Sequence, residues 1–138
     1  VEETTKKADD AEYKAYELQK KISEKKKDLE DKENREERAR NSYDSAVSDY
    51  KKALDIYNQS DSSNDVVQKS LDSLSRKAMV NTAKNNMDNK KRAWDKAIRE
   101  REQAQKELDE LNEQLRELTG DMNALHRYLN SLEKEKNL

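Results

Sequence analysis

Apolar side chains return every three or four residues along two long stretches of this chain, one in each half. This spacing puts them on one face of a helix, and a seven-residue repeat is typical of coiled coils. We call each such row of residues a seam. The first seam consists of Ala8, Ala11, Ala15, Leu18, Ile22, Lys25, Leu29, Lys32, Glu36, Ala39, Tyr43, Ala46, Tyr50, Ala53 and Tyr57. The second consists of Val80, Ala83, Met87, Lys90, Trp94, Ala97, Arg101, Ala104, Leu108, Leu111, Leu115, Leu118, Met122, Leu125, Leu129 and Leu132.

The two seams are similar in length and are joined by about 22 residues, which favours a hairpin whose second helix returns along the first. Pairing residues whose numbers add to 137 puts Tyr43 opposite Trp94. It also puts the only acidic seam residue, Glu36, opposite the only seam arginine, Arg101. A polar pair within a seam is a known way to set register. The sequence therefore predicts an all-α fold, a long antiparallel two-helix coiled-coil hairpin with an irregular or short-helical tip. The alternative is that the leucine-rich second helix pairs with another copy of itself.

We expect one domain over residues 1–138, with a first helix at about 4–58, a tip at about 59–79 and a second helix at about 80–136. The tip begins with serine, asparagine and aspartate, which favour turns. It continues with four apolar residues at helical spacing that lie on the face opposite the second seam. Either the helix breaks and this piece folds back, or the hairpin presents an apolar face to solvent. The four residues are Val67, Leu71, Leu74 and Ala78.

Composition agrees with a coiled coil and disfavours a compact globular core. Charged residues make up 43% of the chain and hydrophobic residues 31%, with no Phe, Pro or Cys and one Gly. The 29 basic and 31 acidic residues are interspersed, so we expect solvated helix faces and no nucleic-acid partner. No apolar run is long enough for membrane insertion. The chain does not begin with Met, and we expect it to be a piece of a longer protein.

No arrangement of residues typical of catalysis or metal binding is found. The single histidine, His126, has no second ligand at helical spacing and is best interpreted as a solvated residue. A two-helix rod offers no concave, water-excluding pocket of the kind an active site needs. We therefore expect a non-enzyme without catalytic residues, metal ligands or cofactor.

Three short stretches carry a resemblance to a known family. The chain opens with VEE, has the run NMDNKKRAWDKA at Asn86–Ala97, and closes with EKEKN. In these features it resembles the receptor-binding domain of the E-group nuclease colicins. The resemblance implies a monomeric middle domain of a secreted antibacterial toxin. In that family the hairpin tip docks on an outer-membrane transporter of the target bacterium, the cobalamin transporter for the E group. The family's tip includes glycine, proline and phenylalanine, and residues 58–79 of this chain contain none of them.

The resemblance places the receptor contact in the tip, roughly from Asn58 to Met79. Apolar anchors accompanied by a few positive groups would suit the loops of a transporter. The expected contact residues are Asp65, Val66, Val67, Lys69, Leu71, Leu74, Arg76 and Lys77. Two other functions fit a hairpin of this kind. One is a structural coiled-coil spacer whose helices dimerise, and the other is a host-binding segment of a bacterial surface protein.

Overall fold

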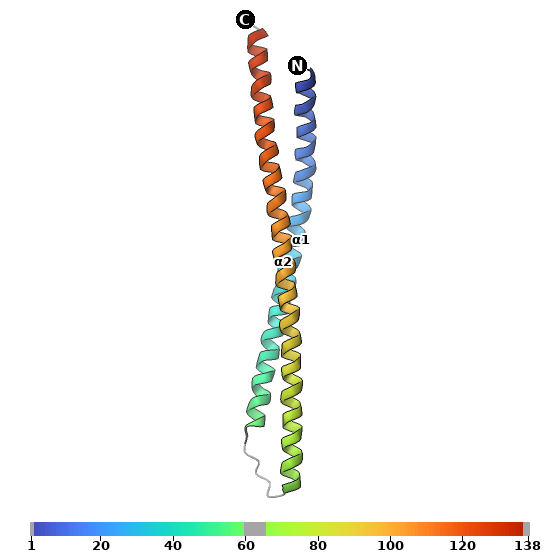
Figure 1. The fold of residues 1–138 in the computed structure, drawn as a ribbon, viewed down its shortest axis with the longest axis vertical. Coiled ribbons are helices and arrows are strands. Elements are labelled where there is room, and N and C mark those ends of the chain that lie inside the picture. Colours follow the sequence, from blue (N-terminus) through green and yellow to red (C-terminus); the bar gives the residue numbers. More distant parts are fainter. Residues whose placement is uncertain (1, 60–65, 137–138) are drawn as a thin grey trace. The chain divides into compact units, whose positions relative to one another are not determined.

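A computed structural model describes residues 2–59 and 66–136 of the chain, with side chains described outside 66–71. It consists of two α-helices, α1 (Glu2–Tyr57) and α2 (Val66–Lys136), which pack against each other, and the described residues form no strand. Each helix is uninterrupted along its whole length (Figure 1). The predicted all-α helical hairpin is confirmed.

The ends of the helices follow from their local sequence. Glu2 and Glu3 lie in the first turn of α1, and Lys134 and Lys136 lie in the last turn of α2. Both placements are favourable, because a helix carries partial positive charge at its N-terminus and partial negative charge at its C-terminus. After Tyr57 the chain tightens. The Asn58 amide donates to the Leu54 carbonyl at 2.9 Å, and the Gln59 amide donates to the Ile56 carbonyl at 3.2 Å. This change from a four-residue to a three-residue spacing is common where an α-helix ends.

The start of the second helix differs from the bounds expected from the sequence. We expected that helix from about residue 80, but α2 begins at Val66 and runs without a break through Met79. The segment between these residues contains no glycine or proline and includes leucine, lysine, arginine and alanine, which favour helix. A change in which face is apolar does not break a helix whose backbone hydrogen bonds all remain intact. Of the two alternatives for this segment, α2 therefore has the continuous helix.

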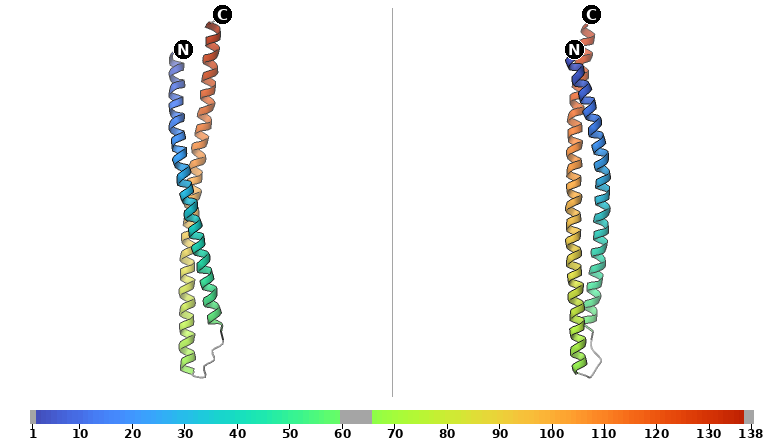
Figure 2. Two further views of the ribbon diagram at one scale, coloured as in Figure 1. Left: turned by 180° about the vertical axis from the view of Figure 1, so that it is seen from behind. Right: turned by 90° about the vertical axis from the view of Figure 1, so that its right-hand side faces the viewer.

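The chain forms two compact units. Unit 1 comprises Val1–Asp31 and Glu102–Leu138, and unit 2 comprises Lys32–Arg101. In each unit a segment of α1 packs against an antiparallel segment of α2, and the views of Figure 2 show both segments of unit 2 running side by side.

The core of unit 1 is built entirely from seam residues. Ile22, Leu29, Ala104 and Leu108 form one buried cluster, and the half-buried Leu111 and Leu115 pack against it. Both helices contribute large aliphatic side chains to this cluster, Ile22 and Leu29 from α1 and Leu108 from α2. The other buried residues of unit 1 are Ala8, Ala11 and Ala15.

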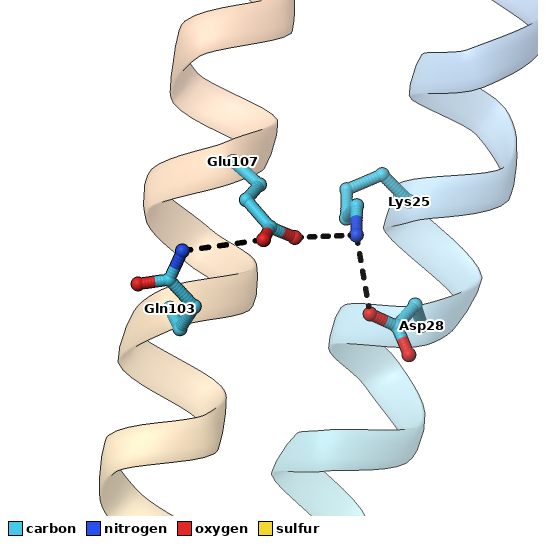
Figure 3. A network of polar contacts seen from close by, with 4 residues as sticks. All are labelled: Lys25, Asp28, Gln103 and Glu107. Atoms are coloured by element: carbon cyan, nitrogen blue, oxygen red, sulfur yellow. Dashed lines mark hydrogen bonds and ion pairs between the residues drawn. The ribbon is translucent and has the colours of Figure 1, made fainter.

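A polar network crosses the edge of the seam in unit 1 (Figure 3). Lys25 Nζ donates to Glu107 Oε2 at 2.5 Å and lies 3.5 Å from the Asp28 carboxylate, and Gln103 Nε2 donates to Glu107 Oε1 at 3.2 Å. The hydrogen bond that Lys25 donates to the Glu107 carboxylate raises the pKa of Lys25 above its ordinary value of 10.5. The same bond lowers the pKa of Glu107 below its ordinary value of 4.5. Each charge therefore stabilises the other at neutral pH.

Unit 2 has a different seam. Among its described side chains, the buried apolar ones are three alanines, Ala46, Ala53 and Ala97. The Tyr43 and Trp94 rings meet across the seam with their centroids 5.4 Å apart and their planes tilted by 30°. Half-buried aromatic rings thus take the place of the aliphatic cluster found in unit 1.

The structure also brings Glu36 and Arg101 together, as expected from pairing residues whose numbers add to 137. Arg101 Nε donates to Glu36 Oε2, and both side chains are partly buried, with 32% of arginine and 23% of glutamate exposed. Tyr43 and Trp94 follow the same rule, so that both contacts belong to one register. That the charged pair is what sets this register stays a prediction.

A lysine also contacts the face of the Trp94 ring. Lys91 Nζ lies 4.4 Å from the centroid of the Trp94 ring and 5.5 Å from that of Tyr43, and it forms an ion pair with Asp95 at 3.4 Å. Such cation–π contacts add about 0.5–1 kcal/mol at partly exposed sites. The indole Nε1 of Trp94 is buried and has no hydrogen-bond partner among the described residues. Packing, not hydrogen bonding, therefore holds the ring.

Two seam positions of unit 2 are not covered by the opposite helix. Tyr57 is 43% exposed, and Lys90 is also exposed. Tyr57 is the last residue of α1, so no further turn of that helix encloses it. Lys90 can keep its ammonium group in water while its methylene groups lie along the helix. The single glycine, Gly120, lies on an exposed face of α2, and nothing approaches within 4 Å of where its Cβ would be.

Candidate protein-binding surface at the end of the hairpin

Large aliphatic side chains are exposed where α1 ends and α2 begins. Ile56 is 38% exposed, Met79 48% and Leu74 65%, and Tyr57 lies beside them in the sequence. We call these four residues the end surface. Ile56 and Met79 line one groove, whereas Leu74, five residues before Met79, lies about 140° around α2 from it. Large exposed aliphatic side chains are typical of interaction sites when several occur near one end of a molecule.

An open groove of about 670 Å³ lies next to these residues, between α1 and α2. Its apolar lining consists of the small side chains of Ala53, Ala78 and Ala83 together with the larger Ile56 and Met79. We call it the end groove. Because alanine fills little space, the two helices leave a hollow here that larger residues would close. The polar lining consists of Asp49, Lys52, Ser75, Thr82 and Asn86.

A hydrogen bond connects the residues just after α1 to α2. Arg76 Nη1 donates to the backbone carbonyl of Gln59 at 3.0 Å. This carbonyl lies just beyond the end of α1, where backbone acceptors have no partner within the helix. The bond holds Arg76 half-buried, so its guanidinium group has a structural role in addition to the contact role expected from the sequence.

The charged groups of the end groove have no partner of their own. Neither Asp49 nor Lys52 forms an ion pair or side-chain hydrogen bond within residues 2–59 and 66–136, and both are exposed. They lie one helical turn apart on α1, with opposite signs. The α2 side of the groove carries only neutral polar groups, those of Ser75, Thr82 and Asn86. The groove therefore offers one negative and one positive group along one side and uncharged hydrogen-bonding groups along the other.

The expected contact residues fall into three groups. Leu74 and Lys77 are exposed, as a contact role needs, while Arg76 is half-buried. Asp65 lies outside the described residues. Four others belong to the first turns of α2, but their side chains are not among those described: Val66, Val67, Lys69 and Leu71.

Sequence reasoning missed Ile56 and placed Met79 only at the limit of the contact region, not among the named contact residues, while the structure places both beside the groove. Each directly precedes a seam residue, Ile56 before Tyr57 and Met79 before Val80. A residue next to a seam position lies on the flank of the helix pair, about 100° around the helix from the seam. Two large apolar flank residues at matching ends of the two seams were a usable signal for this surface.

The other grooves and side-chain pairs point less clearly to a site. A groove of about 440 Å³ in unit 1 is bordered mainly by charged residues, among them Lys14, Glu17 and Lys21. His126 Nε2 lies 3.3 Å from the Glu12 carboxylate, and both side chains are about half exposed. No group of three or more potential metal ligands occurs among the described residues. Neither α1 nor α2 has, in its described part, a stretch apolar enough to cross a membrane.

No protein-family model matches the chain, and no curated protein or solved structure matches it significantly.

Proposed function

We propose that this chain is the receptor-binding domain of a colicin-like bacteriocin and that the end of its hairpin docks on an outer-membrane transporter of the target bacterium. The transporter we propose is of the cobalamin type, which the colicin resemblance of the sequence suggests. The chain would act outside the producing cell, as part of a larger secreted toxin.

One observation carries the proposal, namely the exposure of Ile56, Leu74 and Met79 at the end of the hairpin. These side chains have no polar atom that water could satisfy, apart from the weakly accepting Met79 sulfur. Full burial of an exposed aliphatic side chain contributes about 1.5–3 kcal/mol, and these partly exposed side chains would gain the corresponding fraction of it. Lys77 adds a positive group in the same region, which can speed association with a negatively charged partner.

A protection assay tests the proposal. The purified chain is mixed with bacteria that are sensitive to an E-group colicin, which is then added. If the chain occupies the receptor, it protects the cells in proportion to its concentration. The double variant Leu74→Glu/Lys77→Glu should need at least about tenfold more protein for the same protection, because it places negative charge on an apolar contact. Binding of labelled chain to bacteria that lack the cobalamin transporter should fall to background.

A matched control makes the same change in charge on another surface. Tyr16 and Lys20 are both exposed on α1 in unit 1, and the variant Tyr16→Glu/Lys20→Glu makes an equal change in charge. It should protect as well as the wild type does. Full protection by the Leu74→Glu/Lys77→Glu variant, with an unchanged helical circular dichroism spectrum, would contradict the proposal. So would a wild-type chain that protects no cells.

A further inference from the structure

We propose that the end groove binds a short amphipathic helix of the partner protein, with its apolar stripe against Ala53, Ala78 and Met79. The bound helix presents a basic residue to Asp49 and an acidic residue to Lys52. This inference rests on the proposed function in placing the partner at the end of the hairpin, and it adds the structural class and charge pattern of the segment that is bound.

The dimensions of the groove suit a helix of two to three turns. Its lining residues on α1 run from Asp49 to Ile56, which is about 10 Å of helix at 1.5 Å per residue. Those on α2 run from Ser75 to Asn86, which is about 16 Å. A third helix laid along two antiparallel helices packs its side chains between theirs, and alanines allow a close approach. Recognition of this kind uses anchors at i, i+3, i+4 and i+7.

Hydrogen bonding favours a helix over an extended segment as the occupant. An extended peptide needs backbone partners, which binding domains normally supply from an exposed sheet edge. The walls of this groove belong to α1 and α2, where backbone groups already bond within their own helix, and near the end of α1 the Ile56 carbonyl accepts from the Gln59 amide. A bound helix satisfies its own backbone in the same way. It therefore loses no hydrogen bonds when its apolar face enters the groove.

The charges along the groove specify one side of the bound helix. Asp49 and Lys52 have no partner in the described part of the chain and lie one turn apart. A basic and an acidic residue spaced three or four apart on the bound helix would meet them both. The opposite side of that helix faces Ser75, Thr82 and Asn86, so it needs no charge. Charge complementarity of this kind sets orientation and partner choice more than it sets affinity.

Synthetic peptides test this inference without the receptor. Each probe is a fluorophore-labelled helical peptide of about 18 residues, long enough to form helix when it is bound. One face carries leucines at helical spacing, and one flank carries a lysine and a glutamate one turn apart. Two versions carry the two charges in opposite order, because the groove does not fix the direction of the bound helix. A third version has the same composition with a scrambled order.

Fluorescence anisotropy should show saturable binding of one charge order to the wild-type chain, and no binding of the scrambled peptide. The variants Ala78→Glu and Met79→Glu should each bind that peptide at least about tenfold more weakly. Ala124→Glu is the matched control, since Ala124 is also exposed on α2 but lies outside the groove, and it should bind as the wild type does. Exchanging the rim charges, with Asp49→Lys and Lys52→Glu together, should reverse which charge order binds more tightly.

Three results would overturn the inference. They are no saturable binding of either charge order, equal binding by Ala78→Glu and the wild type, or a preference for one charge order that the Asp49→Lys/Lys52→Glu variant leaves unchanged. Sedimentation of the chain alone tests whether a second copy of the chain fills the groove. A dimer that Ala78→Glu dissociates and Ala124→Glu does not would show that a second copy fills the groove. If the chain bound no peptide but still protected cells, the inference that a helix occupies the groove would be wrong, while the proposed receptor-binding function would stand. If the chain bound the peptide but protected no cells, the proposed receptor-binding function would be wrong, while the end groove would remain a helix-binding site.

Discussion

Unit 1 and unit 2 are made from the same two helices, yet they bury different kinds of side chain. Unit 1 buries Ile22, Leu29 and Leu108 in one aliphatic cluster. Of the side chains described in unit 2, the buried apolar ones are alanines, and the larger contacts are the Tyr43–Trp94 ring pair and the Glu36–Arg101 ion pair. Aliphatic burial is strong and indifferent to exact pairing, whereas rings and charges need particular partners. We infer that unit 1 supplies most of the stability and unit 2 most of the specificity of register.

The exposed residues of the two units differ in a parallel way. In the described part of unit 1, the large apolar residues that are exposed are the tyrosines Tyr13, Tyr16 and Tyr128, whose hydroxyl groups can bond to water. Those in unit 2 include Ile56 and Leu74, which have no polar side-chain atom. An exposed tyrosine is easily tolerated in water, while large exposed aliphatic side chains are more typical of a surface that binds a partner. The contrast therefore favours unit 2 as the part of the molecule that binds.

The largest effect that separates the units is expected from one leucine in each. Leu108→Ala in unit 1 removes a side chain that is 7% exposed and should lower the free energy of unfolding by about 2–4 kcal/mol. Leu74→Ala in unit 2 removes one that is 65% exposed and should change it by less than about 0.5 kcal/mol. Urea unfolding followed by circular dichroism measures both. Equal losses would show that Leu74 packs in solution and that the end surface is not free.

A smaller effect is expected from the ion pair of unit 2. Glu36→Leu leaves Arg101 partly buried without its acceptor and should lower the free energy of unfolding by about 1–2 kcal/mol. Adding Arg101→Leu should restore most of the loss, because a seam pair of leucines is well packed and carries no unpaired charge. A double-mutant cycle in urea gives the coupling between the two residues.

The register itself has a separate readout. Cysteines at positions 43 and 94, in place of Tyr43 and Trp94, report whether these positions still face each other. In the otherwise wild-type chain they should form one intramolecular disulfide efficiently. In the double leucine variant the yield should fall, because other registers become accessible. An unchanged yield would mean that packing alone sets the register and that the charged pair is dispensable for it.

Much of this architecture could be predicted from the sequence, because heptad spacing and the antiparallel pairing of the seams follow from residue numbers alone. The antiparallel hairpin followed from the two seams, and the contact between Glu36 and Arg101 followed from their numbering. What could not be read was how side chains lie where the seam pattern stops. Nothing in the spacing showed that Arg76 would reach the Gln59 carbonyl, since that depends on where α1 ends. The groove was equally hidden, because it arises from space that alanines leave empty, and a hydrophobic pattern counts alanine and leucine alike.

The smallest effect concerns pH and the network of unit 1. Glu107 has a lowered pKa, so its contribution to stability is present above 4.5 and is lost as pH falls through the lowered value. Lys25 has a raised pKa, so its contribution is present below 10.5 and is lost as pH rises through the raised value. The stabilisation thus spans the range between 4.5 and 10.5 and disappears outside it. With side chains 26% and 41% exposed, the pair is screened by solvent and the effect should be small.

The variant Glu107→Gln isolates this contribution. Near neutral pH it should unfold at a slightly lower urea concentration than the wild type, and the difference should vanish in acid well below pH 4.5. Added salt should reduce the difference, since the ion pair is only partly buried. Glu110→Gln removes an equal charge from the same exposed stretch of α2, where Glu110 has no ion pair among the described residues. If both variants showed the same dependence on pH, the network with Lys25 would contribute nothing beyond overall charge, and the aliphatic cluster alone would account for the stability of unit 1.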